Sequence, residues 1–112
     1  MICASADLRD GEDGVRFTVR RGGREVPAFA VRFGGTVYAY LNRCAHVAVE
    51  LDWESGRFFD SDRQFLICAT HGALYVPDSG RCVAGPCRGG WLEALPVVER
   101  DGGVFLAGGA GD

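Results

Sequence analysis

Two short boxes, Cys44-Ala45-His46 and Cys68-Ala69-Thr70-His71, stand out in the 112-residue sequence. Twenty-one residues separate His46 from Cys68. These are the two histidines of the chain, so a site that uses both leaves none for a second histidine-dependent site. Each box follows a run typical of a β-strand and enters a turn, which predicts that both pairs lie on loops at strand ends. A hairpin scaffold would bring these loops together at one end of the domain.

Two thiolates and two neutral imidazoles suit zinc or iron. A tetrahedral zinc ion fits this set, and so does a [2Fe–2S] cluster in which two cysteines hold one iron and two histidines hold the other. Zinc fingers usually pair like with like, whereas each box here carries one Cys and one His. The mixed boxes favour a two-iron cluster held by two loops, with zinc as the alternative.

Short β-type runs separated by glycine-rich turns predict an all-β domain. The expected strands are residues 15–19, 25–33, 36–41, 64–68, 73–76, 91–100 and 104–106. Gly34-Gly35 predicts a two-residue hairpin, residues 81–90 a loop, and residues 47–53 one short helical piece. We expect Trp53, Phe58 and Phe59 to pack beneath the segment between the boxes.

Composition excludes several classes of protein. The 12 basic residues, all arginines, against 15 acidic residues give a net charge of −3, which argues against a nucleic-acid partner. No stretch approaches 18 apolar residues and the start has no signal-like pattern, so no membrane span is expected. Five cysteines are an odd number, which argues against a full disulfide framework and favours the reducing cytoplasm. We expect a single domain over residues 1–112, with an ordered core from about 15 to 106 and a flexible tail at 107–112.

With both boxes in place, the chain resembles the Rieske-type ferredoxins, which include the ferredoxin components of ring-hydroxylating dioxygenases. The matching residues are Cys44, His46, Cys68, His71, Gly72 and the Gly85-Pro86 pair of a loop that covers the cluster. The resemblance implies a Rieske-like fold of small antiparallel sheets with two cluster-binding loops at one end. It also implies one [2Fe–2S] cluster per chain, with Cys44 and Cys68 on the buried iron and His46 and His71 on the outer iron near solvent.

The chain departs from this family pattern in three places. The gap of 21 residues between the boxes is longer than in the usual dioxygenase ferredoxins. Neither box has the additional Cys that forms a loop-bridging disulfide in respiratory-complex members, and Ala73 stands where high-potential members carry Ser. Tyr75 matches a Tyr that donates a hydrogen bond to a ligand sulfur, although an ordinary core aromatic is the alternative. We therefore expect a reduction potential near the low end of the roughly −150 to +300 mV range of Rieske centres.

The function that the resemblance implies is one-electron transfer from a reductase to a terminal oxidoreductase, with an oxygenase as the expected acceptor. No catalytic site of its own is expected, since both histidines are used and no glycine-rich cradle for a flavin or nicotinamide is present. The alternatives are a small Rieske subunit of a larger oxidoreductase, such as nitrite reductase, and a zinc-stabilised interaction module. Cys82 and Cys87 are expected to be bystanders, with a disulfide or extra ligation as the alternative, and Cys3 to be incidental.

Overall fold

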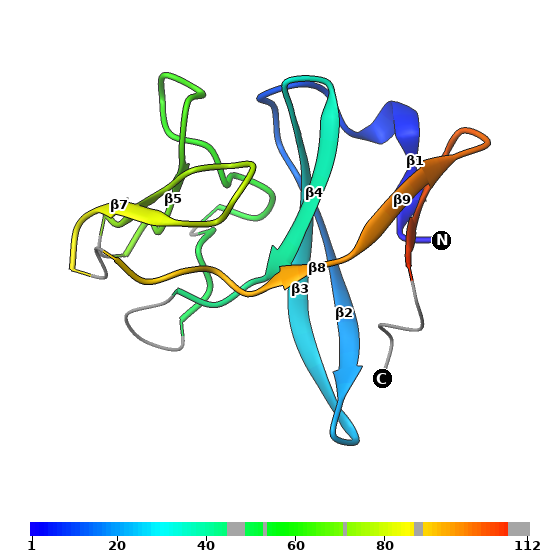
Figure 1. The fold of residues 1–112 in the computed structure, drawn as a ribbon, viewed down its shortest axis with the longest axis horizontal. Coiled ribbons are helices and arrows are strands. Elements are labelled where there is room, and N and C mark those ends of the chain that lie inside the picture. Colours follow the sequence, from blue (N-terminus) through cyan, green and yellow to red (C-terminus); the bar gives the residue numbers. More distant parts are fainter. Residues whose placement is uncertain (45–48, 53, 71, 87–88, 108–112) are drawn as a thin grey trace.

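The computed structural model describes every residue except 45–48, 53, 71, 87–88 and 108–112 (Figure 1). Apart from the short 3-10 turn η1 (Ser5–Asp7), the regular structure of the described residues is all β, as predicted. The strands are β1 (Cys3–Ala4), β2 (Val15–Arg21), β3 (Arg24–Phe33), β4 (Thr36–Leu41), β5 (Leu66–Ile67), β6 (Leu74–Tyr75), β7 (Cys82–Ala84), β8 (Ala94–Leu95), β9 (Val97–Arg100) and β10 (Gly103–Leu106). No helix among these residues has the length and hydrophobicity needed to span a membrane.

The strands form three small sheets with antiparallel pairing. The central sheet has the order β2-β3-β4-β8, and the other two have the orders β1-β10-β9 and β5-β6-β7. In Figure 1 the central sheet stands between them, with β9 on one flank and the β5–β7 sheet on the other. The expected small antiparallel sheets are therefore present.

The hairpin between β3 and β4 turns at Gly34-Gly35, as predicted. Phe33 pairs directly with Thr36, so these two glycines form the whole turn. Their φ angles are +60° and +83°, and a tight turn with two positive φ values is the one that matches the twist of the flanking strands. The hairpin fixes the register of β4, whose end leads to Cys44.

The core is divided in two by β3, which is buried on both faces. Successive side chains of a strand point to opposite faces. Phe29 and Val31 therefore join one cluster, whereas Ala28 and Ala30 join the other. We call the first, which contains Cys44, Cys68 and Tyr75, the cysteine core, and the second the distal core. The distal core lies between β3 and the β1-β10-β9 sheet, where buried Cys3 pairs with Val104.

The structure differs from the sequence prediction at several short elements. The expected strand 91–100 is divided at Pro96, which has no N–H for a sheet ladder, into β8 in the central sheet and β9 in the β1-β10-β9 sheet. The expected loop 81–90 contains β7, and β1 was not predicted. The helical piece at 47–53 is wrong for residues 49–52, which are not helical, and its other residues lie outside the described part of the chain.

Candidate metal centre

Both box cysteines begin loops of the same size. Cys44 follows β4 and Cys68 follows β5. The Cys44 N–H donates to the carbonyl of Val49 at 2.8 Å, and the Cys68 N–H donates to the carbonyl of Ala73 at 2.9 Å. Each hydrogen bond closes a loop at the fifth residue after its cysteine. Both loops thus share the same closing hydrogen bond, although the boxes differ in length.

The two loops are joined to one another. The Ala69 N–H, in the second loop, donates to the carbonyl of Leu51, just after the first loop, at 3.0 Å. Cys44, Leu51 and Cys68 belong to the same core cluster and are at most 2% exposed. The structure therefore brings the predicted cysteines together in a buried setting. His46 and His71 lie outside the described residues, so their assignment remains a prediction.

Tyr75 reaches the first loop from β6. Its side chain is fully buried, and its hydroxyl oxygen lies 3.2 Å from Cys44 Sγ. A metal-bound cysteine is a thiolate and only accepts hydrogen bonds, so the phenol would be the donor. The geometry thus supports the hydrogen-bonding role over that of an ordinary core aromatic.

A third segment, β7 with the turn after it, packs against the second loop. Tyr75 pairs with Cys82 across the sheet, and Cys82 Sγ donates to the carbonyl of Ala84 at 3.3 Å. Gly85 then passes so close to Ala73 that a Cβ on it would lie 2.7 Å from the Ala73 Cα. The expected covering loop is therefore in contact with the second cysteine loop, while Cys87 lies outside the described residues.

The segment between the boxes is part of the core. Phe58 is fully buried and stacks on Phe29 of β3, with ring centroids 4.0 Å apart, and Phe59 stacks on Phe33. The predicted packing of these two phenylalanines is confirmed, and Trp53 lies outside the described residues. Residues of the longer segment between the boxes thus form part of the core.

Two buried polar side chains at the base of the first loop were missed by sequence reasoning. Asn42 Nδ2 donates to Asp52 Oδ1 at 2.9 Å, and both residues are less than a tenth exposed. Asp52 is buried, although an acidic residue is usually exposed to solvent. No local sequence signal separates it from the exposed acids.

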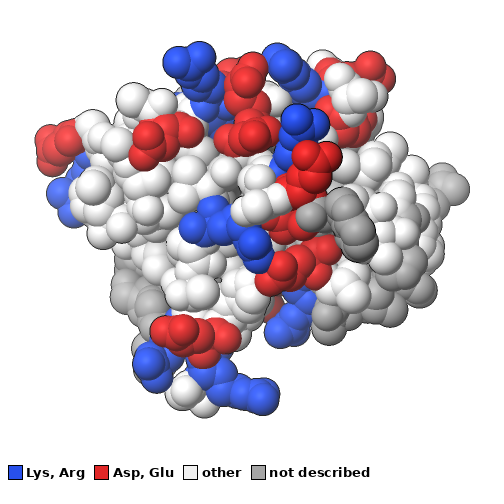
Figure 2. All heavy atoms as spheres, turned by 180° about the vertical axis from the view of Figure 1, so that it is seen from behind, with Lys and Arg blue, Asp and Glu red and all other residues white. Residues whose placement is uncertain are grey.

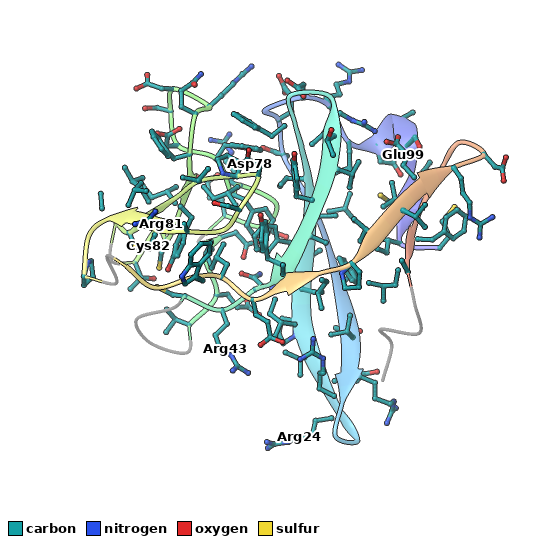
Figure 3. All side chains as sticks on the ribbon, viewed as in Figure 1. Arg24, Arg43, Asp78, Arg81, Cys82 and Glu99 are labelled. Atoms are coloured by element: carbon teal, nitrogen blue, oxygen red, sulfur yellow. The ribbon has the colours of Figure 1, made fainter. Side chains whose placement is uncertain are left out.

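The charged residues near the cysteine loops lie on the segments that join the three short strands beside those loops, and not on the strands themselves. Strands β5, β6 and β7 contain no Asp, Glu, Lys or Arg. In Figure 2 charged side chains gather along the upper edge, in a band through the middle of the face and at the tip of the β2–β3 hairpin. The backbone of Arg81, just before β7, forms an isolated antiparallel bridge with that of exposed Trp91. Arg81 lies on the opposite side of the molecule from Glu99 of β9 (Figure 3).

The donor set fits a metal cluster better than a catalytic site. Two buried sulfurs in joined loops, one facing a phenol, are suited to hold soft metal ions and to stabilise their charge. The model of the Rieske [2Fe-2S] domain matches residues 1–99 of the chain. The chain belongs to the Rieske [2Fe-2S] domain family. Its cofactor is accordingly a [2Fe–2S] cluster, and family membership does not favour the zinc alternative.

Solved structures show the same Rieske fold. A chain in a complex of reduced oxygenase and oxidized ferredoxin in carbazole 1,9a-dioxygenase matches with a TM-score of 0.70 and 25% identity, covering 95% of this chain and 98% of that chain. The ferredoxin of carbazole 1,9a-dioxygenase from Nocardioides aromaticivorans IC177 matches with a TM-score of 0.70 and 24% identity, covering 95% and 93%. A ferredoxin of Sphingomonas yanoikuyae B1 matches with a TM-score of 0.66 and 23% identity, covering 94% and 93%. No curated protein matches the chain.

Proposed function

We propose that this Rieske protein is a one-electron carrier, without a catalytic site of its own, that passes electrons from a reductase to a terminal oxygenase in the cytoplasm. The observation that carries the proposal is the pair of joined loops that bury Cys44 and Cys68 beside the Tyr75 hydroxyl. Similar chains of nearly the same length occur in carbazole 1,9a-dioxygenase, one of them in a complex of oxygenase and ferredoxin, which supports an oxygenase as the acceptor.

In this proposal Cys44 and Cys68 hold one iron and His46 and His71 hold the other. When bound, the cluster supplies a site that accepts and releases one electron. The protein's own residues exclude water and donate hydrogen bonds. Leu51 and Phe58 bury the cysteine side, and Tyr75 donates to the Cys44 sulfur. Exposed Trp91, whose backbone is bridged to Arg81 just before β7, offers an aromatic side chain for brief contact with a partner protein.

The ligand assignment is tested by iron and sulfide analysis with EPR of the reduced protein. We expect about two iron and two sulfide per chain, and loss of both when Cys44, His46, Cys68 or His71 is replaced by Ala. Cys3→Ala is the matched control, because Cys3 is also buried but belongs to the distal core. A wild-type protein that binds zinc and no iron under iron-replete anaerobic expression would contradict the proposal.

The carrier role is tested by redox stoichiometry. Anaerobic titration with dithionite should consume one electron per chain, and the reduced protein should return that electron to cytochrome c. Size-exclusion chromatography of the native protein separates a diffusible carrier from a subunit of a larger oxidoreductase. Elution only as part of a larger complex would favour the subunit alternative.

A further inference from the structure

Asn42 and Asp52 are the two buried polar residues among those described, and they contact one another beneath the first cysteine loop. Asn42 stands two positions before Cys44. The backbone N–H of Asn42 donates to the carbonyl of Pro27 on β3 at 2.8 Å, which anchors it to the central sheet. The Asp52 carboxylate has no exposed area. Burial of a carboxylate has a high cost in free energy unless its oxygens accept hydrogen bonds or face a cation.

Both polar atoms of the Asn42 side-chain amide make hydrogen bonds. Its Nδ2 donates to Asp52 Oδ1 at 2.9 Å, and its Oδ1 accepts the Leu51 N–H at 2.8 Å. A rotated amide would set its NH₂ group against the Leu51 N–H and its oxygen against the carboxylate. One amide orientation is therefore fixed.

Asp52 is likewise held on both oxygens. Its Oδ1 accepts from Asn42, and its Oδ2 accepts the Gly56 N–H at 2.9 Å. Arg16 of β2 approaches Oδ2 with Nε at 3.4 Å and binds Glu50 with its NH2 group at 2.6 Å. The carboxylate is thus compensated by a cation from the central sheet.

These contacts continue into the second loop through a single residue. Leu51 gives its N–H to Asn42 Oδ1 and accepts the Ala69 N–H on its carbonyl. A line of hydrogen bonds therefore runs from β3 through Asn42 and Leu51 to the loop of Cys68. Leu51 is fully buried, so this connection is shielded from water.

We propose that Asn42 and Asp52 are positioning residues that set the separation of the two cysteine loops, and thereby the geometry and retention of the cluster. The inference rests on the proposed function, because it requires a cluster between those loops. Neither side chain is a ligand; both act through Leu51 and the backbone of the loops. Outer residues of this kind commonly change metal affinity by about 10–100-fold when they are lost.

A reciprocal exchange provides the test. In Asn42→Asp a second carboxylate faces Asp52, and the donor between them is lost. In Asp52→Asn one amide must satisfy the Asn42 NH₂ group and the Gly56 N–H together, so one donor faces another donor. In the double variant Asn42→Asp/Asp52→Asn, the carboxylate now at position 42 accepts from the Leu51 N–H and from the amide now at position 52. The oxygen of that amide accepts the Gly56 N–H, so the double variant restores the hydrogen bonds between positions 42, 51, 52 and 56, while the charge moves away from Arg16 and the recovery is expected to be partial.

The readouts are the EPR g-values of the reduced cluster and the rate of iron release to a chelator. We expect each single variant to release iron about 10–100-fold faster and to shift the g-values, and the double variant to return toward wild type on both measures. Tyr40→Phe is the matched control, because it loses a buried hydrogen bond of 2.7 Å, to the Pro77 carbonyl, in the same core. It should leave the g-values unchanged.

The failures of the two proposals are distinguishable. Wild-type protein without a cluster would overturn the proposed function. Wild-type protein with a cluster, and single variants with unaltered spectra and iron release, would overturn the positioning role alone. A double variant as impaired as the sum of the singles would overturn it as well. Should Asn42→Asp not fold, recovery of a folded, cluster-containing double variant supports the pairing, and its failure to fold contradicts it.

Discussion

The hydroxyl oxygen of Tyr75 lies 3.2 Å from the sulfur of Cys44, 31 positions earlier in the chain. The contact joins β6 to the first cysteine loop and is fully buried on the tyrosine side. A hydrogen bond to a ligand sulfur stabilises the reduced form, which is the more negative one. Tyr75 therefore connects a packing position of the core to the redox property of the site.

Tyr75→Phe should lower the reduction potential, because it removes the donor and keeps the ring. A hydrogen bond of about 0.5–1.5 kcal/mol corresponds to roughly 20–60 mV for a one-electron couple. Protein-film voltammetry on both proteins measures the shift. Tyr40→Phe, in the same core but bonded to a backbone carbonyl, should leave the potential within a few mV, on the order of the measurement error. Equal shifts in both variants would contradict the specific role of Tyr75.

Ala73→Ser should raise the potential. Ala73 is fully buried at the closing hydrogen bond of the second loop, and it stands where the resemblance to high-potential members places a serine that donates a hydrogen bond at the cluster. The expected shift is again tens of millivolts, about that of one net hydrogen bond. Ala73→Gly, which changes the side chain without adding a donor, is the control for altered packing. An intact cluster with an unmoved midpoint in the serine variant would show that no such bond forms.

Gly85→Ala should destabilise the protein more than Gly89→Ala. Both glycines have positive φ values, +95° and +91°, so each alanine bears similar backbone strain. A Cβ at Gly85 would meet the Ala73 backbone at 2.7 Å, whereas none of the described residues lies within 4 Å of a Cβ at Gly89. Overpacking of this kind costs about 1–3 kcal/mol. Denaturant unfolding of the two holo variants measures the difference, and equal midpoints would indicate that the covering segment moves away freely.

Glu99→Gln should reduce stability in a pH-dependent way. Arg32 binds both carboxylate oxygens of Glu99, at 3.1 and 2.6 Å, and this hydrogen bonding lowers the pKa of Glu99 from 4.5 to about 2. A lowered pKa gives stability that is present above the ordinary value and is lost as the pH falls through the folded value. The free energy of unfolding of the wild type should therefore exceed that of the variant by a constant amount near neutral pH. This difference should shrink as the pH falls from about 5 to 2. Urea unfolding at a series of pH values tests this, and a margin that does not change with pH contradicts it.

The sequence predicts best where residue chemistry is restrictive. The two boxes indicate a metal centre because cysteines and histidines at such spacing have few other uses. Gly34-Gly35 predicts its hairpin because few residue pairs accept two positive φ values. Both predictions depend on local properties, and the structure confirms the hairpin and the burial of Cys44 and Cys68 in joined loops.

What the sequence does not predict depends on contacts between distant segments. Strands β1 and β7 are two and three residues long, and they are strands only through their partners. In the sequence Asp52 resembles any surface acid, and only the folded chain shows that it is buried and bonded to Asn42. The change of sheet at Pro96 likewise depends on which strands lie nearby. None of these features leaves a local pattern in the residues themselves.

The double burial of β3 has a consequence for how this protein matures. The distal core contains neither Cys44 nor Cys68, so its apolar contacts do not require iron. The cysteine core contains both cysteines of the proposed ligand set, so we expect binding of the metal to stabilise its loops. We therefore expect the distal core of a newly made chain to pack without the cluster, and the cysteine loops to become ordered when iron and sulfide bind. Binding of the cluster would then be the last step in the folding of the cysteine core.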